Sequence, residues 1–149
     1  MKITDFANTG PTLRPEEYFA GSMKAWGLFQ DRTGAVKRQF VVDIHGEWDG
    51  KTLILTEDFT YGGVVGQATI EVAGNAMNLR YTFDLAVGEK TYRLNFDDWM
   101  FLQPDGKRMI NRAAVTKFGL RVGEVTVFFD KSEDALQAPK HIQMMQAAE

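Results

Sequence analysis

Alternation of apolar and polar residues, interrupted by short turn sequences, is the feature that most constrains the fold of this chain. Between residues 22 and 131 nearly every segment alternates with the two-residue period of a β-strand. Because a two- or three-residue turn pairs the strands that flank it, the pattern predicts eight strands in antiparallel up-and-down order. Glycine-containing turns separate the strands at 32–34, 49–50, 62–63, 74–75, 88–89, 104–106 and 118–119.

The turn positions also predict the register between neighbouring strands. For example, the loop at 104–106 places Asp98 opposite Arg112, and the loop at 32–34 places Trp26 opposite Phe40. The seven turns together leave one continuous apolar face. A twisted meander of this kind removes its edges by closing into an antiparallel up-and-down barrel of about eight strands. An open sheet or a sandwich is the less favoured outcome.

The two ends of the chain differ from this pattern, so we divide it into three parts. Residues 1–13 read as an irregular arm, 14–131 as the β-barrel domain and 132–149 as a helical tail. Pro15 begins a short helical turn that ends near Gly21. Ser132 is suited to be the N-cap of a C-terminal helix, which Pro139 interrupts.

Composition excludes several classes of function. The chain of 149 residues carries a net charge of −3 and has a pI of about 5.4, so we expect no nucleic-acid partner. It has no cysteine, which excludes disulfides and thiolate chemistry. Its two histidines, His45 and His141, lie far apart and lack metal-ligand spacing, so we expect no metal and no cofactor. No apolar run reaches the roughly 20 residues that span a bilayer.

Charged residues occur on the face that the pattern buries, and they have two interpretations. Asp98 and Arg112 can form a buried ion pair that only fixes the register. Alternatively, the arginines outnumber the acids, and one of them holds a ligand carboxylate together with Tyr81 or Tyr92 while the apolar walls take an acyl chain. Exposure of some arginines at strand ends is a third possibility. The charged residues in this phase are Arg38, Glu57, Asp98, Arg112 and Arg121.

Catalysis has weaker support than binding. Glu57 and Asp98 can act as an acid and base pair, because burial shifts carboxyl pKa values. However, the sequence has no nucleophile elbow, no glycine-rich phosphate loop before a helix and no Ser/His/Asp arrangement. Enzymatic activity is therefore left open, with a non-enzymatic role preferred.

Several apolar residues, among them Phe29, Trp99 and Phe101, fall on the face of the sheet that the pattern turns outward. We expect the chain's own termini to cover them.

Four segments resemble the bacterial domain-of-unknown-function family 3833. The resemblance covers roughly residues 12 to 131, and its most specific motifs are AWG-x-x-QDR-x-G and FDDWM. The segments are EEYFAGSMKAWGLFQDRTG (16–34), GEWDGKTLILTEDFTY (46–61), YRLNFDDWMFL (92–102) and INRAAVTKFGLRVGEVTVFFDK (110–131).

The resemblance implies a lipocalin-like (calycin-like) barrel in an envelope lipoprotein, often encoded beside fatty-acid-modifying enzymes. It implies a periplasmic or membrane-anchored location, although this chain has no lipoprotein signal and no cysteine to carry an anchor. The calycin pattern also implies that Trp26 packs under a basic side chain, Arg121 or Lys131. The family carries an additional hairpin between the positions of Tyr61 and Val64, where this chain has only two glycines.

We therefore predict a lipocalin-like protein that binds a fatty acyl or other small apolar anionic ligand in its barrel. The alternatives are a filled barrel that serves as a structural or interaction module of the envelope, and an accessory protein to fatty-acid-modifying enzymes. The predicted binding residues are Arg38, Arg112, Arg121, Tyr81, Tyr92, Glu57, Asp98 and Trp26.

Overall fold

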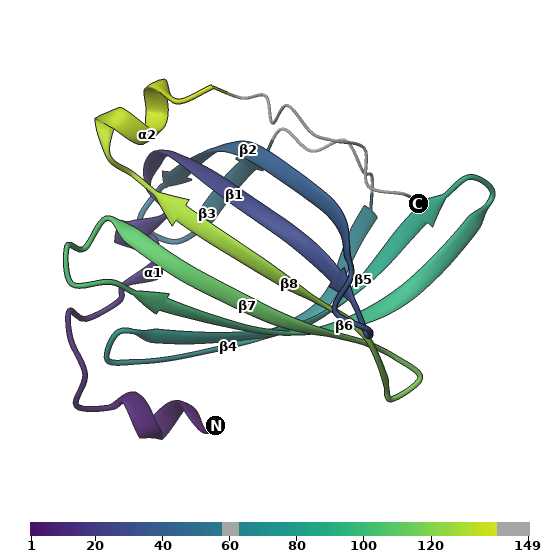
Figure 1. Ribbon diagram of the computed structural model, residues 1–149. Coiled ribbons are helices and arrows are strands. Elements are labelled where there is room, and N and C mark those ends of the chain that lie inside the picture. Colours follow the sequence, from purple (N-terminus) through teal and green to yellow (C-terminus); the bar gives the residue numbers. More distant parts are fainter. Residues whose placement is uncertain (58–62, 140–149) are drawn as a thin grey trace.

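The computed structural model describes residues 1–57 and 63–139, without the side chains of residues 57, 63–67 and 87. One antiparallel sheet of eight strands curls into a half-barrel (Figure 1), which confirms the predicted all-β, up-and-down fold. The elements are η1 (Ile3–Phe6), α1 (Pro15–Tyr18), β1 (Gly21–Asp31), β2 (Val36–Trp48), β3 (Leu53–Glu57), β4 (Gly63–Ala73), β5 (Ala76–Val87), β6 (Lys90–Leu102), β7 (Arg108–Lys117), β8 (Leu120–Asp130) and α2 (Glu133–Gln137).

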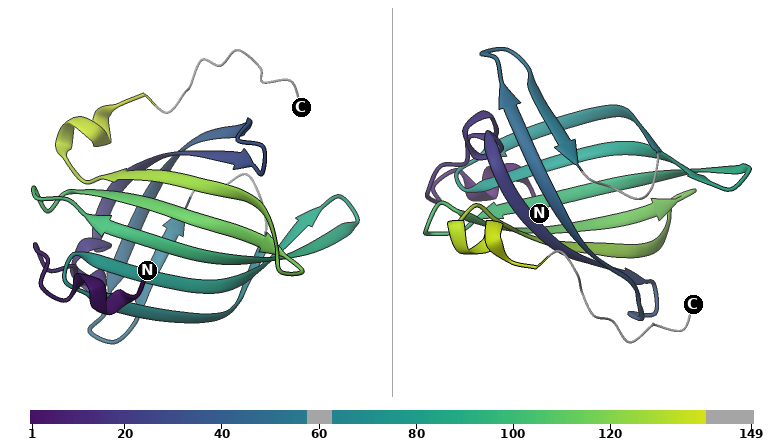
Figure 2. Two further views of the ribbon diagram at one scale, coloured as in Figure 1. Left: turned by 60° about the horizontal axis from the view of Figure 1, so that its bottom comes forward. Right: turned by 90° about the horizontal axis from the view of Figure 1, so that it is seen from above.

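The first and last strands of the chain pair with each other, and the two edge strands of the sheet come from the middle of the sequence. β1 pairs with both β2 and β8, whereas β3 and β4 are the outermost strands in the order β3-β2-β1-β8-β7-β6-β5-β4 (Figure 2). The turn predicted at 62–63 would have paired β3 with β4. That pairing is wrong for the described residues, because β3 and β4 are not neighbours in the sheet. Of the predicted turn, Gly63 begins β4, while Gly62 lies outside the described residues.

Two of the predicted turns set the observed register. At 74–75, Val72 lies opposite Met77, and at 88–89, Leu85 lies opposite Tyr92. The turn at 49–50 is longer than predicted, since Trp48 pairs with Leu53. The Asp49 carboxylate accepts hydrogen bonds from the backbone N–H groups of residues 51 and 52, which holds a four-residue loop. The resulting shift is two residues, so the side chains of β3 keep their predicted face.

Elsewhere the register differs by one residue, and this reverses the side chains of β7. The Asp105 carboxylate accepts from the backbone N–H groups of residues 107 and 108, and Gln103 N–H donates to the Arg108 carbonyl, so the loop is longer than three residues. Asp98 therefore lies opposite Ala113, and Arg112 lies opposite Trp99. The predicted Asp98–Arg112 pairing is wrong because one extra loop residue turns Arg112 outward.

Three irregularities in strand pairing produce the other one-residue shifts, and one of them lies between Val65 and Ala68 where β4 meets β5. The register changes between Phe29 and Gln30 where β1 meets β2, and between Val115 and Thr116 where β7 meets β8. Such bulges place an extra residue in one strand. As a result Trp26 lies opposite Val41 rather than Phe40. β1 thus turns its buried Ala25 and the following Gly27 and Phe29 inward, and Trp26 outward beside Phe128 of β8.

The core is concentrated at one end of the half-barrel, which we call the closed end. There α1 and its flanking residues Leu13 and Phe19 pack against strand residues such as Met23 and Phe129 (Figure 1). Lys131 Nζ donates to the backbone carbonyls of Tyr18 and Ala20, and it lies over the Tyr18 ring. Of the two basic partners that the calycin pattern implies for Trp26, Lys131 therefore holds α1, and Arg121 pairs with Glu124.

The termini cover part of the outer face, as predicted. Phe6 of η1 packs on Trp99 and Phe101, with ring centres 5.8 and 5.3 Å away. The expected irregular arm thus contains a short 3-10 helix. At the other end, Ser132 caps α2 by accepting from the Ala135 N–H. The remainder of the predicted helical tail from residue 140 lies outside the described residues. Within the described part, no helix is long and apolar enough to cross a membrane.

Candidate ligand-binding site

The inner face of the half-barrel changes in exposure along its length. At the closed end its side chains are buried, as for Met77, Met100 and Val127. Towards the opposite end, which we call the mouth, lie the turns at 32–34, 88–89 and 118–119 (Figure 1). Inner-face apolar side chains on that side are only half-buried. They are Phe29, Phe40, Leu79, Tyr81, Phe83, Leu85, Tyr92, Leu94, Phe96 and Val125.

Glycines in the wall allow two of these aromatic rings to lie against the backbone. A Cβ at Gly27 would lie 2.2 Å from the Phe40 ring, and a Cβ at Gly123 would lie 2.5 Å from the Phe29 ring. No real Cβ approaches that closely, so each ring occupies space that only glycine leaves free. Tyr81 and Phe96 also stack in parallel along the wall, with centres 4.9 Å apart. The rings therefore line the wall of the half-barrel.

A buried polar pair lies between the closed end and this apolar wall. Asp98 on β6 and Asn111 on β7 are 6% and 3% exposed. Asn111 Nδ2 donates to the Asp98 carboxylate and also, at 3.2 Å, to the Trp99 carbonyl. The pKa of Asp98 is raised to about 6, mainly because burial disfavours the charged carboxylate; the hydrogen bond from Asn111 opposes this rise, and the neighbouring Asp97 charge adds to it. Among the described side chains, an amide rather than the predicted arginine is the partner of this acid.

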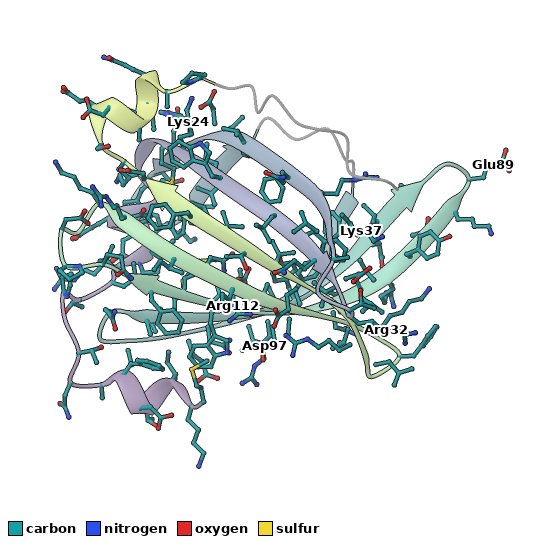
Figure 3. The ribbon with its side chains drawn as sticks, in the orientation of Figure 1. Lys24, Arg32, Lys37, Glu89, Asp97 and Arg112 are labelled. Atoms are coloured by element: carbon teal, nitrogen blue, oxygen red, sulfur yellow. The ribbon has the colours of Figure 1, made fainter. Side chains whose placement is uncertain are left out.

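Two of the predicted anion-binding arginines lie on the outer face instead. Arg112 (Figure 3) forms an ion pair of 2.7 Å with Glu124, and Arg121 pairs with the same carboxylate. Both arginines are exposed. Their predicted inward position is wrong, because the extra loop residue before β7 and the bulge beside Thr116 reverse their direction. The predicted anion site required more arginines than acids on the inner face. Among the described residues, this excess of arginine is absent.

The other predicted residues are divided between the wall, the mouth and the outer face. Tyr81 and Tyr92 are in the inner phase, as predicted. Arg38 is exposed and lies near the mouth, since it pairs with Phe29 close to the β1–β2 turn. Trp26 lies on the outer face, as described above. Glu57 ends β3, and its side chain lies outside the described residues.

Two residues of the candidate site were not predicted from the sequence. Asn111 falls in the inner phase only once the β6–β7 loop has its observed length. Lys117 is the last residue of β7 and continues its row of inner-face positions to the mouth. There its Nζ lies 4.6 Å from the centre of the Tyr92 ring. The available signal was the lysine directly before the Phe118-Gly119 turn. The structure thus places a cation at the mouth and an acid deep inside.

The structure defines an antiparallel up-and-down half-barrel protein that has a packed core at one end and a half-buried apolar inner wall towards the other. The chain belongs to the family described as Protein of unknown function (DUF3833), whose model matches residues 1–63 and 62–131. The two matched segments meet at Gly62 and Gly63, the position at which the resemblance implies a missing hairpin. No curated protein and no solved structure gave a significant match.

Proposed function

We propose that the half-barrel binds one elongated apolar ligand with the character of a fatty acyl chain along its inner wall. The observation that carries this proposal is the difference in exposure along the inner face. Side chains of the same type are buried at the closed end and half-buried towards the mouth. A wall of half-buried aromatic and aliphatic side chains gains free energy when an apolar ligand removes it from water, at about 25 cal/mol per Å².

The charges favour an orientation in which the polar end of such a ligand lies at the mouth. An ionised Asp98 repels an anionic head group from the inner end of the wall. Lys117 attracts one at the mouth, where the Tyr92 hydroxyl is a possible hydrogen-bond donor. The ligand class predicted from the sequence, a small apolar anion, is therefore retained, but Lys117 replaces Arg112 and Arg121 as its partner.

Titration with a fluorescent fatty acid in vesicle-free buffer tests this function. We expect saturable uptake by delipidated protein, and a co-purified lipid in native mass spectrometry of gently purified protein. Phe83→Asp places a charge on the inner wall and should weaken uptake at least tenfold. Thr82→Asp, the adjacent outer position on β5, is the matched control and should leave uptake unchanged.

A second comparison tests the head-group position. Lys117→Gln should weaken binding of a fatty acid about threefold while leaving binding of the corresponding fatty alcohol unchanged, because only the acid carries the charge. Circular dichroism of each variant checks the fold. Absence of both uptake and co-purified lipid would overturn the proposal and favour the filled-barrel interaction module.

The envelope location remains part of this proposal. It is supported by the resemblance to envelope lipoproteins, and a role beside fatty-acid-modifying enzymes would fit a carrier of acyl chains. Fractionation of cells that naturally express the protein tests the location, since a cytosolic protein would contradict it.

A further inference from the structure

The turn between β7 and β8 presents two apolar side chains to solvent at the mouth. Phe118 is 91% exposed and Leu120 is 70% exposed. Phe118 also has a φ of +51°, in the left-handed region that favours glycine or asparagine. Neither packing within the chain nor backbone conformation therefore accounts for an aromatic residue at this position. A strained and exposed aromatic side chain at the tip of a hairpin points to a contact outside the chain.

Basic side chains surround this apolar tip. A surface pocket of about 540 Å³ lies beside Phe118, between β6 and the end of β7. It is lined by Lys90, Arg93 and Lys117, and none of the described residues that line it is acidic. Arg93 is partly neutralised by Asp84, at 2.9 Å, so the two lysines supply most of the local positive charge. This grouping contrasts with the net charge of −3 for the whole chain.

The same end of the molecule carries further charged side chains of both signs. Arg32 and Lys37 (Figure 3) lie at the β1–β2 end of the mouth, and Glu89 marks the tip of the β5–β6 hairpin. Lys37 is paired with Asp31 at 3.7 Å, whereas Lys117 Nζ lies 4.6 and 5.6 Å from the centres of the Tyr92 and Phe118 rings. An aromatic and aliphatic tip beside Lys90, Arg93 and Lys117 has the composition of a side-chain cluster that inserts at a membrane surface.

We propose that the mouth docks on an anionic lipid bilayer. Phe118 and Leu120 insert at the level of the head groups, and the pocket formed by Lys90, Arg93 and Lys117 receives a lipid phosphate. Charge complementarity favours this occupant, because anionic leaflets attract basic segments and aromatic side chains prefer the interface between head groups and acyl chains. The proposal does not depend on ligand binding inside the barrel, although docking in this orientation would bring the inner wall to the bilayer.

Vesicle flotation tests the docking surface. We compare vesicles of phosphatidylcholine alone with vesicles that contain three parts phosphatidylcholine to one part phosphatidylglycerol. The protein should bind the anionic vesicles and lose binding at high salt. The double variant Phe118→Asn/Leu120→Ser should reduce binding at least tenfold, because two apolar side chains are lost. Asparagine suits the left-handed backbone of this turn, so the fold is preserved.

Matched control variants lie at other places on the surface. Ile54→Ser removes a similarly exposed apolar side chain on the edge strand β3, and it should leave vesicle binding unchanged. Lys90→Gln should reduce binding about fivefold, whereas Lys51→Gln in the β2–β3 loop at the closed end should not. In addition, Phe118→Trp should give tryptophan fluorescence that brominated lipids quench beyond the quenching of the parent protein.

The outcomes separate docking from ligand uptake. Loss of vesicle binding by Phe118→Asn/Leu120→Ser, with uptake of the fluorescent fatty acid unchanged in vesicle-free buffer, supports the docking surface. Equal binding of parent and double variant, equal binding to neutral and anionic vesicles, or binding of the parent to neither would overturn it. A failure of fatty-acid uptake alone would overturn only the proposed function.

Discussion

Replacement of Asp98 by asparagine should stabilise the protein at neutral and alkaline pH relative to the parent. The Asp98 carboxyl is 6% exposed, and burial raises its pKa from 3.8 to about 6. Because the folded state holds this proton more tightly than the unfolded state, stability falls as pH rises from about 4 to about 6. The difference in pKa corresponds to about 3 kcal/mol. The Asp98→Asn variant does not ionise and so avoids that cost.

The assay is urea denaturation of parent and variant between pH 4 and pH 8. The difference in the free energy of unfolding should shift in favour of the variant by about 2.4 kcal/mol between pH 4 and pH 7, and then change little. Contributions that do not depend on pH, such as altered hydrogen bonds to Asn111, cancel in this comparison. Carboxyl ¹³C NMR should show Asp98 titrating near pH 6.

A matched control is Asp97→Asn on the outer face of the same strand. The Asp97 side chain is half exposed, lies 3.7 Å from Arg80 and accepts a hydrogen bond from Asn78, which an asparagine oxygen can also accept. Its replacement should change stability by less than about 1 kcal/mol, and it should lower the pKa of Asp98 because it removes the neighbouring charge. The reasoning is refuted if the parent-to-variant difference for Asp98→Asn stays constant across the pH range, or if Asp98 titrates near 4.

Three further predictions concern packing and register. Gly46→Ala should destabilise the protein by about 3 kcal/mol in urea denaturation, because the added Cβ would lie 1.6 Å from the Phe19 carbonyl at the closed end. Lys131→Met should cost about 2 kcal/mol and increase hydrogen exchange in residues 14–20, since it removes a charged donor to the carbonyls of that segment. Arg112→Ala should cost less than about 1 kcal/mol, because its pair with Glu124 is exposed.

Each of these predictions has an outcome that would contradict it. A fully stable Gly46→Ala variant would mean that the chain before β1 does not pack on β2 as described. Unchanged hydrogen exchange in Lys131→Met would mean that α1 is held by apolar contacts alone. A decrease of several kcal/mol in the free energy of unfolding of Arg112→Ala would mean that this side chain is buried, as the predicted register had it.

Much of the fold could be predicted because the relevant signals are local. Strand segments follow from alternation, and the turns at 74–75 and 88–89 set their pairings correctly because each contains only the two predicted residues and the strands pair without a bulge next to it. β8 also received its correct inner face, with Val125 and Val127 inward. That success combined two errors, since the shift in the β6–β7 loop and the bulge between β7 and β8 cancel.

The candidate site was harder to predict because it depends on single-residue shifts. Asp98 was placed inward correctly, but its partner was not, since one additional loop residue exchanges Arg112 for Asn111 on the inner face. Bulges carry no reliable sequence signature, and they reversed Trp26 and Phe29 as well. A prediction of buried charges fails wherever the register slips by an odd number of residues.

Sequence alone determined the all-β class, the number and order of strands, the apolar inner face and the starts of the short helices at Pro15 and after Ser132, because propensity, period and turn chemistry act over a few neighbouring residues. Tertiary structure decided which ions are buried, which end is closed and where the sheet has its edges. Those features depend on packing between strands that are distant in sequence, where a slip of one residue leaves the local pattern intact and reverses every side chain.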